Sequence, residues 1–416
     1  MNPPEPPAAG DDDERLATFR AGLPALAAGI YLNTGTSGPL PAETDAAMRQ
    51  QSDWELTVGR GNIDGFMVAL ERLGELRAVA AAVVTADLDD IAINHGATDG
   101  MNSAVLGIDW RPGDRAVTTR HEHPGGLGPL LVVRDRFGVE VDLLDIGDGG
   151  DRAAVVAAFD RAIDERTRAV VLSHVLWSTG AVLPVREIAD VAHDRGALVI
   201  VDGAQAAGAI PVDVAALGAD AYAFPGQKWL LGPEGTGALV VRAAARDRIA
   251  PTMSGYMVYE HVDPDGTAAL WPNARRYETS NIHRPSVVGL ARSIGWLSMF
   301  VGLPWIHERG QRMARLAWDR LAGIDGVQLV TPREAMGTLV SFRVAGWSAQ
   351  AVMDELGARS FAIVRTVPLA DAVRLSVAAF TTEEEIERVA ATVDLLAAHT
   401  PETVPPRRTL TILGEG

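Results

Sequence analysis

The chain has 416 residues, of which 47% are hydrophobic and 22% charged, a composition typical of a globular protein with a sizeable core. Its 54 acidic and 37 basic side chains give a formal net charge of -17, which would repel a nucleic-acid backbone, so nucleic acid is not expected as a partner. The absence of cysteine excludes disulfides, thiolate metal sites and a cysteine persulfide carrier in this chain.

The two ends of the sequence differ from the rest. Residues 1–14 are rich in proline and acidic side chains and are expected to be disordered, and the tail 401–416 is expected to be flexible. The N-terminus resembles neither a secretory nor a transit peptide, and no apolar run reaches the roughly 18 to 20 residues of a membrane helix. A cytoplasmic location without membrane contact is therefore expected. The 9 histidines are scattered and predict no metal site.

Short apolar runs alternate with helical patterns over the first three quarters of the chain. Strands are expected at 91–94, 115–119, 169–173, 197–202, 221–224 and 237–241, and a helix at 186–196. Strands that are apolar on both faces and separated by helices indicate a mostly parallel sheet covered by helices. We therefore expect a large α/β domain over residues 15–302.

After Gly302 the elements become shorter and more mixed. A long helix near Trp305 leads to strands in VQLVTP, TLVSFRV, FAIVRTV and VRLSVAAF, with helices near AQAVMDELGAR and EEEIERVAATVDLLAAH. This density predicts a smaller α+β domain over residues 303–400. The first part of the large domain, to about residue 40, is a candidate to pack with it.

Polar residues follow two of the expected strands, at the edge of a parallel sheet where ligands bind. Gly96, Ala97 and Thr98 open the helix after the first strand, so backbone amides and a hydroxyl there would suit a phosphate. An ordinary capped helix is the alternative. Asp202 ends the most apolar strand, where a carboxylate needs a cation or a strong donor unless it is a helix cap or a structural ion pair.

Lys228, in AFPGQKWLLGPEGTG, is the only lysine among the 37 basic residues. If arginine replaces lysine wherever charge alone matters, the remaining lysine should lie where arginine fails. Arginine keeps its proton in a protein, whereas a lysine amine can lose it and attack a carbonyl. Lys228 is therefore a candidate Schiff-base lysine, and the survival of one lysine by chance is the alternative.

The ordered motifs YLNTGTSGPLP, strand-GAT-helix, DGAQ, GQKW, GPEGTG and VRLSVAAF resemble those of the class V aminotransferase family. These are pyridoxal-phosphate enzymes of fold type I and include cysteine desulfurases, isopenicillin N epimerase-like proteins and carbon-sulfur lyases. The resemblance covers residues 31–380. It implies the cofactor pyridoxal 5'-phosphate, an amino-acid substrate, and a homodimer whose active sites are shared between subunits.

The resemblance also implies roles for individual residues. Lys228 would hold the cofactor and move the proton at the substrate's alpha carbon, and Asp202 would keep the pyridine nitrogen protonated. His123, in TRHEHPGG, would stack on the cofactor ring, with a surface-loop histidine as the alternative. Arg374 would bind the substrate carboxylate as a bidentate fork, with a local glutamate pair as the alternative.

Further contacts follow from the same resemblance. Gly96, Ala97 and Thr98 would hold the phosphate, Gln205 would contact the phenolic oxygen, and Thr279 or Ser280 would reach the phosphate of the other subunit. Asn33 is placed with the substrate-binding residues. Gln227, where many relatives have histidine, is placed among the cofactor contacts. Trp177 stands where desulfurases have asparagine, which suggests a reshaped pocket for a bulkier substrate or, alternatively, core packing.

The reaction is narrowed by what the chain lacks. Desulfurases carry a cysteine-bearing loop between the segments that match Arg365 and Arg374, where this chain has only TVPLADAV. A cysteine desulfurase with a persulfide carrier is therefore not expected. Carbon-sulfur lyase or epimerase chemistry is favoured slightly over transamination, and a catalytically silent interaction protein is the alternative from another class.

Overall fold

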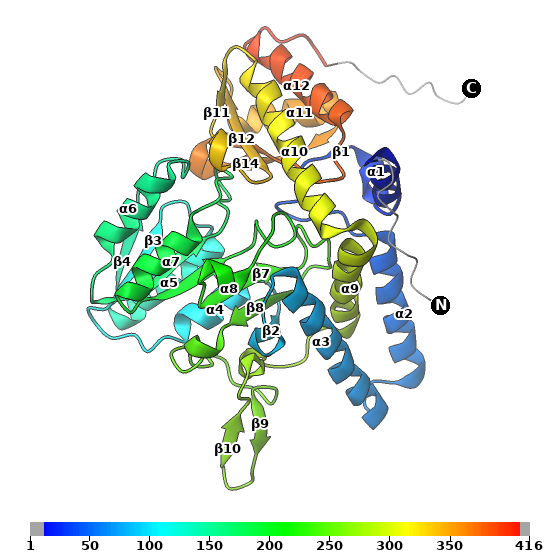
Figure 1. The fold of residues 1–416 in the computed structure, drawn as a ribbon. Helices are drawn as coiled ribbons and strands as arrows, with labels where there is room; N and C mark the ends of the chain where they lie inside the picture. Colours follow the sequence, from blue (N-terminus) through cyan, green and yellow to red (C-terminus); the bar gives the residue numbers. More distant parts are fainter. Residues whose placement is uncertain (1–11, 408–416) are drawn as a thin grey trace.

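A seven-stranded sheet lies at the centre of the larger part of the molecule (Figure 1). In the computed structural model, which describes residues 12–407, its strand order is β2-β8-β7-β6-β5-β3-β4. β8 pairs antiparallel with both of its neighbours, and every other pair is parallel. The strands are β2 (Ile91–Asn94), β3 (Arg115–Thr119), β4 (Glu140–Leu144), β5 (Thr167–Ser173), β6 (Leu198–Asp202), β7 (Ala221–Pro225) and β8 (Gly237–Val241). The prediction of a mostly parallel α/β sheet is confirmed.

Helices cover both faces of this sheet because successive strand residues point to opposite sides. Val117 and Val199 belong to one buried hydrophobic cluster, and Ala116 and Ile200 belong to another. The helices of this part are α2 (Ala42–Val58), α3 (Ile63–Val83), α4 (Ala97–Leu106), α5 (Pro124–Phe137), α6 (Arg152–Ala162), α7 (Val185–Asp194), α8 (Val214–Leu217) and α9 (Arg284–Gly295).

Six expected strands lie close to where the sequence placed them, whereas β4 was not expected. Its sequence EVDLL lies at the edge of the sheet, buries none of its residues fully and lacks the continuous apolar run of a central strand. The hairpin of β9 (Tyr259–Val262) and β10 (Ala268–Leu270) was also not expected. It extends away from the body of the molecule (Figure 1) and buries none of its residues fully.

A second, antiparallel sheet has the order β11-β12-β15-β14 and packs against α10 (Leu303–Ala322), α11 (Ala349–Ser360) and α12 (Glu383–Ala397). Its strands are β11 (Val327–Leu329), β12 (Leu339–Val344), β14 (Arg365–Val367) and β15 (Ala372–Ser376). β1 (Ile30–Tyr31) pairs with β13 (Ala362–Ile363), which brings residues before 40 against this C-terminal region.

The ends of the described chain are in contact with the body. α1 (Asp12–Ala21) overlaps the segment 1–14, and residues 1–11 and 408–416 lie outside the described part, so the expected disorder of those residues stays a prediction. Arg359 donates a hydrogen bond of 2.6 Å to the carbonyl of Pro405, and Arg407 pairs with Glu355 at 3.0 Å. The first residues of the tail 401–416 therefore contact α11.

Short helical turns connect these elements. They are η1 (Pro24–Ala28), η2 (Leu88–Asp90), η3 (Ala243–Ala245), η4 (Ala274–Tyr277), the π-helical η5 (Trp296–Val301), η6 (Arg333–Ala335) and η7 (Pro368–Ala370). Within residues 12–407 no single helix is long and apolar enough to cross a membrane. The pair Arg284–Val301 and Leu303–Ala322, bent by 83°, passes that test by length and composition only.

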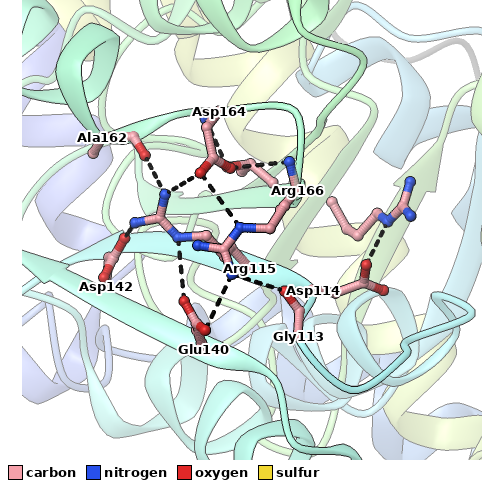
Figure 2. A network of polar contacts seen from close by, with 10 residues as sticks. Gly113, Asp114, Arg115, Glu140, Asp142, Ala162, Asp164 and Arg166 are labelled. Carbon is pink, nitrogen blue, oxygen red and sulfur yellow. Dashed lines mark hydrogen bonds and ion pairs between the residues drawn. The ribbon is translucent and has the colours of Figure 1, made fainter.

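The starts of β3, β4 and β5 are held by an ion network around Arg115 (Figure 2). Arg115 pairs with Asp142 and, at 2.6 Å, with Asp164, while Arg166 contacts Glu140 at 3.1 Å. The network has an evident structural role, since it joins three neighbouring strands at their amino ends. The opposite edge of the sheet is where the chemistry-bearing residues collect.

Candidate active site

The carboxyl ends of five strands meet at one edge of the large sheet. β2 ends at Asn94, β3 at Thr119, β5 at Ser173, β6 at Asp202 and β7 at Pro225. The residues that directly follow these ends include most of the predicted cofactor contacts. The fold thus brings them to one place although the first and last are more than 130 residues apart in the sequence.

Lys228 follows β7 and is partly exposed at this edge. Burial lowers the pKa of its amine to about 8, against the opposing effect of Asp202, and Arg374 and Arg365 lower it further. The amine has no hydrogen bond or ion pair with another described residue. It is therefore more readily deprotonated than an ordinary lysine and free to react, as a carbonyl-attacking amine requires.

Asp202 is buried at the end of β6, where 5% of the residue is exposed. Burial raises the pKa of its carboxyl, and Lys228 partly opposes that effect. Oδ1 accepts a hydrogen bond of 2.9 Å from the amide of Ala204, but no basic side chain pairs with the carboxylate. The structural-ion-pair alternative is therefore not realised within the described residues, and the carboxylate remains available for a cationic ligand group.

His123 caps α5, and its Nδ1 accepts a hydrogen bond of 3.1 Å from the amide of Gly125. Burial lowers the pKa of the imidazole to about 4, with Lys228, Arg365 and Arg374 adding to the effect, so the ring is neutral at pH 7. It meets Trp177 edge to face, with ring centroids 5.3 Å apart. His123 is therefore not a surface-loop histidine; its stacking on a cofactor stays a prediction.

The amino end of α4 also lies at this edge. Gly96 precedes the helix with φ of 145°, a conformation that favours glycine, and its amide donates to Asn94 Oδ1 at 3.1 Å. Ala97 is the first helical residue, and Thr98 is exposed beside Gly125. The helix terminus is thus next to the start of α5, in a position that suits an anion.

Arg374 is completely buried in β15, and no acidic side chain among residues 12–407 pairs with it. Nη1 donates a hydrogen bond of 2.9 Å to the carbonyl of Trp177, whereas Nε and Nη2 have no partner. Arg365 lies directly across from it on β14 and sits 5.7 Å from the ring centroid of Trp177. No described glutamate pairs with Arg374, so the local-pair alternative is wrong. Two unpaired cations on opposed strands indicate a site for an anion.

Asn33 and Gln205 join the amino-terminal segment to the two arginines. Asn33 Oδ1 accepts from Thr36, whose hydroxyl in turn accepts from Arg365 at 3.1 Å. Gln205 donates to the carbonyl of Gly35 at 2.8 Å and accepts from Trp229 at 2.9 Å. Both predicted residues lie at the site, and Gln205 is already engaged in protein hydrogen bonds that hold its amide in place.

Three residues predicted to contact the cofactor make no side-chain hydrogen bond to the other predicted site residues. Gln227 Oε1 is buried without a partner next to Lys228. Thr279 and Ser280 follow η4 and make no hydrogen bond with any of the other predicted site residues. The role of Thr279 or Ser280 at a phosphate therefore stays a prediction.

Four buried polar residues at this edge were not singled out from the sequence. Glu122 precedes His123 and accepts hydrogen bonds from Thr119 at 2.7 Å and Ser173 at 2.6 Å. His174 and Tyr222 contact each other at 3.0 Å, and Asn94 Nδ2 has no partner. The available signal for Glu122 was weaker than that for Asp202, because Glu122 is an acidic residue three positions after β3 ends at Thr119, whereas Asp202 is the last residue of its strand.

Comparison with known proteins agrees with this geometry. The family model for aminotransferase class-V matches residues 30–389, and the chain belongs to that family. A probable cysteine desulfurase of Methanothermobacter thermautotrophicus is 29% identical over 92% of this chain and 98% of its own length. The chain is therefore an enzyme of the pyridoxal-phosphate-dependent class V family, as expected.

Two solved structures extend the likeness. One is a K223A mutant of C-DES with glycine covalently linked to the pyridoxal-phosphate cofactor, with a TM-score of 0.84 and 27% identity over 90% of this chain and 98% of the other. The second is a complex of the cystine C-S lyase C-DES with its reaction product cysteine persulfide, with the same TM-score and identity over 89% and 99% of the two chains. The fold type and the cofactor, pyridoxal 5'-phosphate, are thereby confirmed.

The expected reaction needs correction. We expected carbon-sulfur lyase or epimerase chemistry ahead of transamination and did not expect a cysteine desulfurase. The similar proteins overturn that order, because the curated relatives are named cysteine desulfurases or probable cysteine desulfurases. The absent cysteine showed only that this chain does not carry the persulfide itself, which is narrower than excluding desulfurases.

The residues present fit the cofactor. Lys228 has an unpaired amine, Asp202 an unpaired carboxylate, and Asn94 and Gln227 each have a buried polar atom without a partner. Such atoms cost stability unless a ligand satisfies them. Lys228 would bind the aldehyde, Asp202 would face the ring nitrogen, and the amino end of α4 would hold the phosphate.

Proposed function

We propose that the chain catalyses the removal of sulfur from cysteine, or from a close chemical relative of cysteine, and delivers the sulfur to an acceptor outside the chain. The names of the similar proteins support the substrate class. The observation that carries the proposal is that Lys228 and Asp202, at the carboxyl edge of the large sheet, and Arg374, in β15 of the second sheet, are close enough for both Asp202 and Arg374 to shift the pKa of Lys228. Within the described residues no ion pair occupies any of the three, and two donors of Arg374 have no acceptor. Lys228 would supply the reactive amine, Asp202 would face the ring nitrogen of the cofactor, and Arg374 would bind the carboxylate of the substrate.

Pyridoxal phosphate supplies an electron-accepting ring that stabilises negative charge at the substrate's alpha carbon. Arg374 would hold the substrate carboxylate with the two donors that now lack acceptors, and so orient the alpha carbon. Lys228 would take the alpha proton, since its lowered pKa allows the free amine at neutral pH. Asp202 would hold a proton on the ring nitrogen.

The fate of the sulfur follows from the composition. With 0 cysteines the chain has no thiol to receive it. An external thiol would attack the substrate sulfur, so that a sulfur-sulfur bond forms as the carbon-sulfur bond breaks. Cysteine would then become alanine, and the acceptor thiol would become a persulfide.

We propose in addition that the enzyme is a homodimer in which Thr279 or Ser280 of one subunit reaches the phosphate held by the other. The supporting observation is that, within the described residues, neither side chain makes a hydrogen bond to a predicted site residue of its own chain. The absence of a nucleic-acid or membrane partner and a cytoplasmic location stay predictions.

The test is to load the protein with pyridoxal phosphate and incubate it with cysteine, with and without an added small thiol. Alanine should accumulate together with persulfide in the presence of the thiol, and much more slowly in its absence. Lys228→Ala is the inactive control. Pyruvate with free sulfide, or no sulfur release at all from protein that carries the cofactor, would overturn the proposal.

A further inference from the structure

Glu122 is a second buried carboxyl beside Asp202 that the proposed chemistry does not use. It is 4% exposed, and no basic side chain pairs with it within the described residues. Its two oxygens contact the hydroxyls of Thr119 at 2.7 Å and Ser173 at 2.6 Å, and the backbone of Ser173 adds a hydrogen bond. These neutral donors only partly replace water around a buried carboxylate that has no cation, so the protonated form is favoured.

The position of Asp202 adds to this preference. Asp202 lies directly across from Ser173 in the pairing of β5 and β6, and Ser173 is the residue that contacts Glu122. A methyl group built on Gly126 would lie 3.7 Å from Asp202 Oδ2 and 4.0 Å from Glu122 Oε2, so both carboxyls face the same small space. Two neighbouring buried carboxyls do not both ionise readily, because their charges repel.

The charged groups around the pair decide which carboxyl holds the proton. Lys228 favours the ionised form of Asp202, while no cation is among the main influences on the pKa of Glu122. Tyr222 faces Asp202 from β7, and His123, the next residue after Glu122, is neutral at pH 7. Burial, with repulsion from Asp202 and against the hydroxyl contacts, raises the pKa of Glu122 to about 7. The negative charge at this edge therefore rests on Asp202.

The hydrogen bonds indicate where the proton sits. Thr119 Oγ1 already accepts a hydrogen bond of 3.1 Å from the amide of His121 and donates to Glu122 Oε1. Ser173 Oγ is the remaining acceptor for an O–H group, at the 2.6 Å separation usual for such a bond. In the neutral form Glu122 Oε2 would donate to Ser173.

We propose that Glu122 is a neutral positioning residue, which donates a hydrogen bond to Ser173 and leaves Asp202 as the single anion opposite the cofactor's ring nitrogen. The proposal rests on the proposed function only in assuming that a cofactor's ring nitrogen binds opposite Asp202. The proton on Glu122 is a property of the cofactor-free protein as well, so it can be measured without any activity.

The first measurement is made on cofactor-free protein by infrared spectroscopy over a pH series. Wild type should show a protonated-carboxyl band that persists at pH 6 and fades as the pH rises through about 7. Glu122→Gln should lack that band, whereas Asp202→Asn should keep it. No such band above pH 5 in wild type would overturn the proposal, even if the variants failed to fold.

The second measurement compares the pH dependence of thermal stability. The folded-state pKa of Glu122 is raised from 4.5 to about 7, so its contribution to stability is complete below pH 4.5 and is lost as the pH rises to about 7. The melting temperature of wild type should therefore fall relative to that of Glu122→Gln across this window. A constant difference between the two proteins would contradict the proposal.

The third measurement is cofactor affinity at pH 6, where glutamine mimics the neutral carboxyl. Glu122→Gln should bind pyridoxal phosphate within about 3-fold of wild type, whereas Glu122→Ala and Asp202→Asn should bind it on the order of 10-fold more weakly. Equal losses in Glu122→Gln and Asp202→Asn would show that the ionised form is required and would overturn the proposal. If wild type bound no cofactor, the proposed function would fail, and the infrared result would still decide the state of Glu122.

Discussion

Arg374 reaches from β15 to the loop after β5, where its Nη1 donates a hydrogen bond of 2.9 Å to the carbonyl oxygen of Trp177. This single bond satisfies one of the donors of a guanidinium that is 0% exposed. Burial lowers the pKa of Arg374 to about 9, which still leaves the group charged at neutral pH. Within residues 12–407 no acidic side chain pairs with this buried cation, so the carboxylate of a bound substrate would supply its counter-charge.

Replacing Arg374 by methionine separates the effect of this buried cation on the stability of the fold from its effect on substrate binding. Because a buried charge without a partner is unfavourable, Arg374→Met should unfold in the absence of substrate at the wild-type temperature or above. Its kcat/KM for cysteine should fall on the order of 100-fold, since each charge-assisted hydrogen bond to the carboxylate contributes about 1.5–3 kcal/mol. Thermal unfolding and steady-state kinetics measure the two effects.

Arg309 provides the matched control, because it is also buried but its donors are satisfied by the carbonyl of Ala379 at 2.8 Å and by Asp12 at 3.0 Å. Arg309→Met should lower the melting temperature clearly. If Arg374→Met destabilised the protein as much as Arg309→Met, Arg374 would have a structural role instead.

The single lysine makes the covalent site unusually easy to test. At a pKa of about 8 instead of 10.5, the free amine of Lys228 is roughly 300-fold more abundant at pH 7. The rate at which cofactor-free protein forms the visible band with added pyridoxal phosphate should rise about tenfold per pH unit and level off near pH 8. Stopped-flow absorbance measures this rate.

Borohydride reduction then gives the position, with Lys228→Arg as the control that keeps the charge. Mass spectrometry should find one labelled peptide that contains Lys228, and none in the variant. A rate that continued to rise beyond pH 10, or labelling that survived in Lys228→Arg, would contradict the assignment.

The sequence sufficed for the central sheet because its strands are apolar on both faces. The bounds of β2, β3 and β8 coincide with the expected ranges, and each ends or begins at a glycine or polar residue that interrupts the apolar run. β4 was missed since EVDLL is interrupted by acidic residues and none of its residues is buried, unlike β2 at the other edge, and the β9–β10 hairpin was missed since none of its residues is buried either. Periodicity reports burial, and these strands are not buried.

Site residues that stand out by their chemical type or their place after a strand were predicted from the sequence. Site residues whose importance depends on their spatial neighbours were missed. Lys228 and Asp202 stand out by composition and by position after a strand. Glu122 matters through its closeness to Asp202, and the pairing of Arg365 with Arg374 depends on strand register, neither of which the sequence displays. The absence of a thiol in this chain gives no information about thiols on the molecules that could accept the sulfur.

Trp177 lies between His123 and Arg365, and substitutions of it can distinguish a role in packing from a role in ligand binding. His123 meets its ring edge to face, and Arg365 lies over it. Trp177→Ala should lower the free energy of unfolding by about 3–5 kcal/mol because it leaves a cavity, whereas Trp177→Phe should cost less than about 1.5 kcal/mol. Urea unfolding of cofactor-free protein measures both.

The indole N–H of Trp177 is buried without a partner, so losing it should not itself destabilise the cofactor-free protein. If Trp177→Phe nevertheless weakens pyridoxal phosphate or cysteine binding by roughly tenfold, the N–H contacts one of them. Equal stability losses in the two variants would show that this packing account of Trp177 is wrong.

Glu278, directly before Thr279, is held by a buried ion pair that should control the loop proposed to reach the other subunit. Arg77 of α3 donates to both of its oxygens, at 2.8 and 2.7 Å, and the amide of Ile93 adds a third bond at 2.9 Å. Arg77→Met would leave a buried charge unpaired and should destabilise the protein by about 3–5 kcal/mol. The double variant Arg77→Met, Glu278→Leu should recover much of that loss.

Retention of pyridoxal phosphate distinguishes this effect from simple destabilisation. The double variant should refold but release the cofactor faster in gel filtration, because the loop at Thr279 and Ser280 is no longer tied to β2. Arg72→Met is the control, since the pair of Arg72 with Glu75 on the same helix is largely exposed and should contribute less than about 1 kcal/mol. If the double variant is stable and retains the cofactor as wild type does, the loop at Thr279 and Ser280 does not contact the phosphate.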